Sequence, residues 1–265
     1  MTKNNDMKIF PNADEFREIA VRTKEKLIEL CDELNIEIAG DVNLADIVVS
    51  IGGDGTFLES SKLTDKPLIG INTGTLGYLT EVNPDDLKKA LEDILNNNYN
   101  IEERMMLEGE IIKSNGDVIK IPASLNEIAI SKNTFGFVRF DAIINEKLIN
   151  SYTADGILVC TPTGTTAYNL SCGGPIADPT AEILTLTPIA PHTVINRSIV
   201  LSKHSVVEIK ITELRGDTSA YVLYDGKPIE VFKNDTIRIR KSDKVTKIIK
   251  LEERSFIDTI RENIS

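Results

Sequence analysis

Apolar residues in the first hundred positions fall into short continuous runs separated by stretches with helical spacing. Short apolar runs bounded by turn residues are typical of buried strands. Here they are Met7–Phe10, Ala45–Ile51 and Pro67–Ile71. Because strands that alternate with helices form βαβ units, the pattern predicts a Rossmann-like parallel sheet in an α/β domain of residues 1–100.

Helices are expected between and after these strands, over residues 13–35, 57–63 and 84–95. Asn12 or Asp14 is a candidate cap for the first helix. Its spacing places apolar side chains on one stripe, at Phe16, Ile19, Ala20, Leu27, Ile28 and Cys31.

The pattern changes after the asparagine run at residues 96–98. Short β-branched runs bounded by turns follow, with a single helical candidate near residues 165–170. They predict an all-β domain over residues 101–250, which makes the chain α+β overall. We expect the last segment, residues 251–265, to pack back onto the first domain.

The composition of the chain limits the kinds of partner that the protein can bind. The formal net charge is −11, and an acidic surface repels nucleic acids and anionic membranes. The chain opens without an apolar signal segment and has no run long enough to span a bilayer, so we expect a cytoplasmic protein. Three cysteines show no metal-binding spacing, and two distant histidines, His192 and His204, make a poor zinc site.

A first candidate site follows the second apolar strand, in the run Gly52-Gly53-Asp54-Gly55-Thr56. Glycines let backbone N–H groups approach a polyphosphate, and the next helix adds its positive N-terminal end. Asp54 then has a use as the acceptor of a hydroxyl proton. A tight turn capped by Asp54 is the alternative. A second glycine turn, residues 72–79, follows the next strand, and ligands bind at such strand ends in open α/β sheets.

A second candidate site lies in the β region. Asn126 and Glu127 interrupt an apolar strand, where adjacent polar side chains need either a ligand or solvent. The stretch from Tyr152 to Pro175 then supplies hydroxyls, a tight Pro-Thr-Gly turn and the flat ring of Tyr168. Such groups on a rigid turn suit a neutral heterocycle.

The combination of GGDGT, Asn-Glu and DG…TPTGTTAYNLSCGGP resembles bacterial NAD kinases over about residues 45–230. The resemblance implies phosphoryl transfer from ATP or polyphosphate, with Mg²⁺, to the adenosine 2′-hydroxyl of NAD, giving NADP. It also implies a homodimer or homotetramer.

By position, the resemblance makes Asp54 the catalytic proton acceptor. It assigns phosphate binding to Gly52, Gly53, Gly55 and Thr56. The expected NAD contacts are Asp54, Gly55, Asn126, Glu127, Thr153, Asp155, Thr163, Thr166, Ala167, Tyr168, Asn169, Leu170, Ser171, Ala190 and Lys227.

Two other functions use the same motifs. GGDGT also occurs in diacylglycerol and sphingosine kinases, but the acidic charge and the absence of a basic amphipathic helix argue against a lipid substrate. A non-catalytic NAD sensor would gain nothing from a carboxylate beside phosphate, so the intact Asp54 favours an enzyme.

Overall fold

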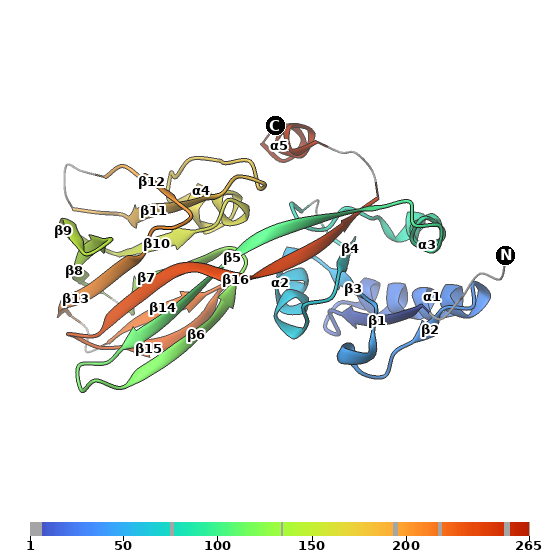
Figure 1. The fold of residues 1–265 in the computed structure, drawn as a ribbon, viewed down its shortest axis with the longest axis horizontal. Coiled ribbons are helices and arrows are strands. Elements are labelled where there is room, and N and C mark those ends of the chain that lie inside the picture. Colours follow the sequence, from blue (N-terminus) through green and yellow to red (C-terminus); the bar gives the residue numbers. More distant parts are fainter. Residues whose placement is uncertain are drawn as a thin grey trace. The chain divides into compact units, whose positions relative to one another are not determined.

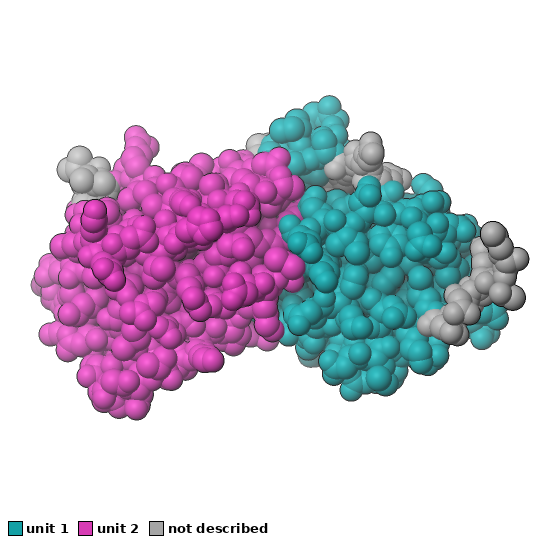
Figure 2. All heavy atoms as spheres, in the orientation of Figure 1, with its two compact units in different colours: residues 1–103, 246–265 teal, residues 104–245 magenta. Residues whose placement is uncertain are grey.

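The computed structural model describes residues 7–74, 77–133, 135–192, 196–216, 219–251 and 255–264. The chain forms two compact units, one of residues 1–103 and 246–265 and the other of residues 104–245 (Figure 2). The chain passes between them within β5 (Asn100–Ile112) and within β16 (Thr236–Lys250).

The first unit contains a parallel sheet in the order β2-β1-β3-β4 (Figure 1). The end of β16 adds to it, with Ile248 opposite Leu68 in parallel register. Every residue of β3 and β4 is buried, as strands covered on both faces require. The sheet confirms the predicted Rossmann-like layout, and its strands are β1 (Lys8–Ala13), β2 (Glu37–Ile38), β3 (Ile47–Gly52) and β4 (Leu68–Asn72).

The helical segments of this unit follow the strands in the expected alternation. Two single turns of 3-10 helix, η1 and η2, precede β3 and α3. Their bounds are α1 (Glu18–Glu33), η1 (Val42–Leu44), α2 (Asp54–Leu63), η2 (Pro84–Asp86), α3 (Leu87–Leu95) and α5 (Phe256–Ile264). No helix in these described ranges is long and apolar enough to cross a membrane.

Helix α1 corrects two expectations. It begins later than residue 13, because β1 runs on to Ala13 and Asp14 forms a turn, accepting the Phe16 backbone N–H at 3.1 Å. Neither Asn12 nor Asp14 caps the helix: Arg17 holds that position without a side-chain cap. The expected apolar stripe is also wrong in part, since Phe16 is fully exposed and Ile28 remains 43% exposed. The buried face carries Ala20, Thr23, Leu27, Leu30 and Cys31.

The second unit is built from antiparallel strands in two sheets, as predicted for the β region. One sheet contains β16 and β5 with β6 (Val118–Ser124), β13 (Val207–Arg215), β8 (Phe137–Ile144) and β9 (Lys147–Ala154). The other has the order β12 (Ile199–Ser202), β11 (Ile183–Ile189), β10 (Gly156–Cys160), β7 (Glu127–Lys132), β14 (Ala220–Tyr224) and β15 (Lys227–Val231).

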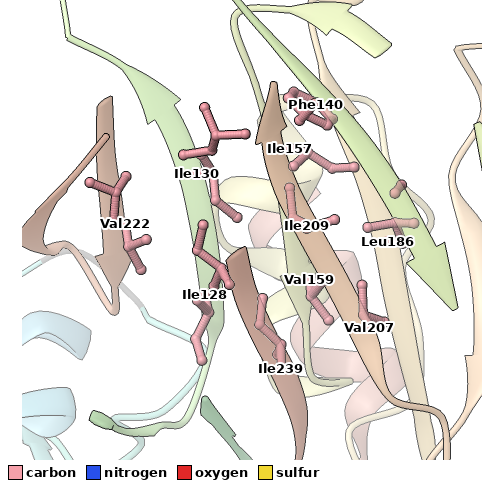
Figure 3. Close-up of a cluster of buried hydrophobic side chains, with 14 of the residues drawn as sticks. Ile128, Ile130, Phe140, Ile157, Val159, Leu186, Val207, Ile209, Val222 and Ile239 are labelled. Atoms are coloured by element: carbon pink, nitrogen blue, oxygen red, sulfur yellow. The ribbon is translucent and has the colours of Figure 1, made fainter. Parts of the chain in front are cut away.

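The core of the second unit lies between these sheets (Figure 3). Ile128 and Ile130 of β7 point into it, as does Phe140 from the other sheet. Because side chains alternate along a strand, Ala129 and Cys160 belong to a separate cluster on the opposite face. Cys172 packs on that face, directly after the short elements η3 (Thr163–Thr166) and α4 (Tyr168–Ser171). Both faces of β7 and β10 are therefore occupied.

Candidate functional site

Asp54 lies at the carboxyl end of β3, as the first residue of α2 after the N-cap Gly53. Its carboxylate accepts the backbone N–H of Tyr78 at 2.8 Å and that of Leu79 at 3.1 Å. Both donors belong to the glycine turn that follows β4. The two glycine loops predicted from the sequence therefore meet at Asp54, although Thr75 and Leu76 of the second loop lie outside the described residues.

The glycines of these loops differ in whether the surrounding structure leaves room for a side chain. A Cβ on Gly77 would lie 2.2 Å from Oδ1 of Asp54, and one on Gly52 would lie 2.2 Å from the Thr56 hydroxyl. Gly53 and Gly55 have no heavy atom within 4 Å of such a Cβ, and neither adopts a left-handed φ. Neither packing nor backbone geometry requires glycine there. Open backbone at a helix N-terminus is what a phosphate group can approach.

Arg17 also lies at this edge of the sheet, and no sequence motif indicates it. Its Nη1 atom lies 2.9 Å from the place a Cβ would take on Gly74, and its Nε pairs with Asp14 at 3.3 Å. The Asp14 backbone N–H donates to the carbonyl oxygen of Ile51 at 3.0 Å. An arginine near a helix start carries no motif, so only the fold shows that it lies against a glycine loop.

Asn126 and Glu127 are both buried, with 9% and 8% of their surface exposed, so the solvent-facing alternative is wrong. Glu127 begins β7 opposite Cys160 and shares its face with Ala129, the face that also carries α4. The Tyr168 backbone N–H donates to its carboxylate. Its Oε2 atom has no hydrogen-bond partner within the described part of the chain.

Burial of the Glu127 carboxyl raises its pKa to about 7, and the neighbouring negative charge of Asp225 adds to this shift. The Tyr168 N–H bond acts in the opposite direction, because it favours the charged carboxylate. Near neutral pH this carboxyl therefore exists both with and without its proton.

The threonine-rich loop is held largely by its own hydroxyls. Thr161 donates to the Leu125 carbonyl at 2.6 Å and accepts the Gly164 N–H at 3.0 Å. Arg104 donates to the Thr163 hydroxyl at 3.2 Å, and the Thr166 hydroxyl donates to the Thr163 carbonyl at 3.2 Å. These hydroxyls give the loop its shape, and direct contacts of Thr163 and Thr166 with a ligand stay a prediction.

The side chains of residues 167–171 differ in their exposure. Tyr168 and Leu170 keep 37% and 36% of their surface exposed, Ser171 is exposed, and Ala167 is half-buried. Asn169 is fully buried. Its amide donates to the carbonyls of Thr165 and Pro175, and its Oδ1 accepts the Thr187 hydroxyl at 2.7 Å. The Asn169 side chain therefore supports the loop from inside, and a contact of this residue with NAD stays a prediction.

The remaining expected residues lie at the ends of neighbouring strands. The Asp155 carboxylate pairs with Lys132 at 2.7 Å, and its backbone N–H donates to Ile189, the residue before Ala190. The Thr153 carbonyl accepts the His192 N–H at 2.8 Å. Thr153, Asp155 and Ala190 are thus brought together. Lys227 is exposed on the β14–β15 turn, opposite Tyr224.

Solved structures identify the fold. The chain matches the crystal structure of yeast NADH kinase complexed with NADH with a TM-score of 0.91, covering 100% of this chain and 89% of the other at 20% identity. It matches an NAD kinase from Archaeoglobus fulgidus in complex with ATP with a TM-score of 0.79, covering 97% and 98% at 24% identity. The architecture is that of the NAD and NADH kinases.

Sequence comparisons identify the family. The family models of the ATP-NAD kinase N-terminal and C-terminal domains match residues 2–99 and 125–251. The NAD kinase of Caldanaerobacter subterraneus subsp. tengcongensis is 39% identical over 83% of this chain and 79% of its own length. That of Lachnoclostridium phytofermentans is 34% identical over 98% and 94%. The chain belongs to the NAD kinase family.

Proposed function

We propose that this protein is an NAD kinase, which transfers the terminal phosphoryl group of ATP to the 2′-hydroxyl of the adenosine ribose of NAD and forms NADP. One observation carries the proposal. In a chain of this family, the Asp54 carboxylate is fixed by two backbone amides at the end of a parallel strand, between two glycine loops.

Asp54 performs the proton transfer in this proposal. Its Oδ1 atom accepts the Leu79 N–H and, at 3.5 Å, the Thr80 hydroxyl. Its Oδ2 atom accepts the Tyr78 N–H and keeps a further lone pair for a substrate hydroxyl. As the 2′-oxygen bonds to the γ-phosphorus, its proton moves to Asp54, the bond from that phosphorus to the β,γ-bridging oxygen breaks, and ADP leaves. The step requires the ribose hydroxyl to come within hydrogen-bond distance of the carboxylate.

The phosphate groups would be bound by Gly52, Gly53, Gly55 and Thr56 at the start of α2. The open backbone at Gly53 and Gly55 supports this assignment. The positive end of the α2 dipole favours an anion at this position. The charge of the protein is negative overall, so binding must come from such local groups.

The nucleoside would be bound in the second unit. Asn126 and Glu127 face the adenosine, and Tyr168 offers its ring for stacking, which its exposure supports. Thr163, Thr166, Ala167, Asn169, Leu170 and Ser171 complete this surface in the proposal. Thr153, Asp155 and Ala190 form the nicotinamide side, and Lys227 is the outlying contact.

Mg²⁺ fits these residues as an ion carried by ATP. In the described part of the chain, no group of three or more His, Cys, Asp or Glu side chains is placed to hold a metal. Mg²⁺ ordinarily keeps several waters and binds through one or two carboxylates plus substrate phosphates, and Asp54 would be one such carboxylate. When bound, the ion neutralises phosphate charge.

The finer points of the proposal are a cytoplasmic location and a homodimer or homotetramer, with inorganic polyphosphate as an alternative phosphoryl donor. Sedimentation of the purified protein decides the oligomeric state. Parallel reactions with ATP and with polyphosphate decide the donor.

The test of function is incubation with NAD, Mg²⁺ and ATP, followed by detection of NADP with an NADP-specific dehydrogenase. Phosphorus NMR of the product distinguishes a 2′-phosphate from a 3′-phosphate. We expect Asp54→Asn to lower kcat by at least about a hundredfold with little change in NAD binding. Phosphorylation of diacylglycerol in place of NAD would replace the proposal with lipid kinase activity, and near-normal turnover of Asp54→Asn would remove Asp54 from its role.

A further inference from the structure

The carboxylate of Asp225 organises the loop that carries Asn126 and Glu127. Its two oxygens accept the backbone N–H groups of Leu125 at 2.9 Å, Asn126 at 2.9 Å and Glu127 at 3.3 Å. In return, the Asp225 backbone N–H donates to the Glu127 carbonyl at 3.1 Å. One side chain from a distant turn thus fixes three consecutive amides.

The turn that presents Asp225 is itself specialised. Asp225 has a φ of 44° and the next residue, Gly226, a φ of 80°, which is the left-handed pair of a tight hairpin turn between β14 and β15. Asp is among the residues that tolerate this conformation. Asp225 is 9% exposed, so its carboxylate is buried beside the loop, where these amides favour its charged form.

We infer that Asp225 is a positioning residue for the nucleoside substrate, because it holds the backbone of Asn126 and Glu127 in place. The inference rests on the proposed function for the identity of the nucleoside. The effects of Asp225 on the loop and on the titration of the Glu127 carboxyl can be measured without catalysis.

The charge effect follows from the groups around Glu127. Asp225 faces it from the β14–β15 turn and Cys160 from β10, while Tyr168 and Cys172 face it from α4 and the residue after it. Both thiols and the phenol have a pKa raised by burial, so they stay neutral near pH 7. Of these four groups, Asp225 is the one whose negative charge raises the pKa of Glu127. Removing it should lower the pKa of Glu127.

The test compares Asp225→Asn with Asp235→Asn in the full-length protein. Asp235 is a matched control because it is also a buried turn aspartate, 1% exposed, that accepts the backbone N–H groups of Ser114 and Phe232. We expect Asp225→Asn to raise KM for NAD at least tenfold while kcat and KM for ATP change less than threefold. Asp235→Asn should leave KM for NAD unchanged.

The second readout is the titration of the Glu127 side-chain carboxyl, followed by carbon-13 NMR in the ligand-free protein. We expect it to move to lower pH in Asp225→Asn and to stay in place in Asp235→Asn. A titration that does not move, or an equal rise of KM in both variants, would overturn the inference. If the wild type forms no NADP, the kinase proposal fails. The Glu127 titration and calorimetric measurement of NAD binding in the Asp225 variants still test the role of Asp225.

Asp225→Glu separates position from charge and serves if Asp225→Asn does not fold. It keeps the negative charge but moves the carboxylate by one methylene. KM for NAD should rise while the Glu127 titration stays near its wild-type position, and an unchanged KM would overturn the positioning role.

Discussion

Gly77 allows the Asp54 carboxylate to reach the backbone amides of Tyr78 and Leu79. Any side chain at Gly77 would begin with a Cβ 2.2 Å from an Asp54 oxygen, well inside van der Waals contact. In Gly77→Ala the carboxylate must therefore move. We expect kcat to fall by about a hundredfold, because small misplacement of a reacting group has effects of that size, and the free energy of unfolding to fall by about 1–3 kcal/mol. Steady-state kinetics and denaturant unfolding measure the two effects.

Gly40→Ala is the control for this change. Gly40 also lies in a loop of the first unit, has no heavy atom within 4 Å of a new Cβ and has no left-handed φ. It should leave kcat and stability unchanged. Equal kinetics for Gly77→Ala and wild type would show that the position of the Asp54 carboxylate does not matter for catalysis.

At the residue scale, the sequence identifies functional residues that belong to a continuous motif. It misses contacts between residues that only the folded chain brings together. Asp54 and the Asn126-Glu127 pair stand out because local context is enough. The contacts of Asp225 and Arg17 do not, because their partners lie far away in sequence, at residues 125–127 and near Gly74. The burial of the Asn169 side chain is not predictable either, because its motif is local and burial is a property of the folded loop.

At the element scale, α1 shows what hydrophobic spacing can and cannot decide. The existence of the helix is predictable, since alternating strands and helices require it. Its exact buried face is not, because apolar residues occupy more of its circumference than the sheet covers: Leu27 is fully buried and Ile28, its neighbour, is 43% exposed. The cap residue is equally hard to predict from the sequence, because Asn12 lies within strand β1 and not at the helix start.

These two neighbours provide a direct test of the buried face. We expect Leu27→Ala to lower the free energy of unfolding by about 2–5 kcal/mol, because it leaves a cavity in a closed core. Ile28→Ala should cost less than about 1 kcal/mol, since much of the side chain is already in water. Denaturant unfolding of the two variants measures the difference, and similar losses would place Ile28 in the core after all.

At the scale of the whole molecule, alternation of strands and helices followed by short strands alone is enough to predict the fold class. The domain limits expected at residues 100 and 250 stay a prediction. Sequence spacing cannot find the return of the chain, because β16 begins in the second unit and ends in the first, pairing at Ile248 with Leu68. Such pairing depends on tertiary contacts, not on any signal within the strand.

Stability should depend on pH through Glu127. Its pKa is about 7 in the folded protein against an ordinary value of 4.5, so between these values the folded state holds a proton that the unfolded state has lost. Stability is therefore highest, as far as this group is concerned, below pH 4.5 and falls as pH rises towards 7. The full fall is up to about 3 kcal/mol, from 1.36 kcal/mol for each pKa unit.

Glu127→Gln removes the titrating group while keeping its shape, so the loss of stability between pH 5 and pH 8 should become smaller by up to about 3 kcal/mol. Glu230→Gln, which changes an exposed carboxylate on β15, should leave the pH dependence as it is. Hydrogen exchange of the β7 and β10 amides is the suitable measurement, because it reports on the second unit alone. Parallel pH profiles for Glu127→Gln and the wild type would show that Glu127 is charged in the folded protein across this range, and that the buried carboxyl is better solvated than its surroundings indicate.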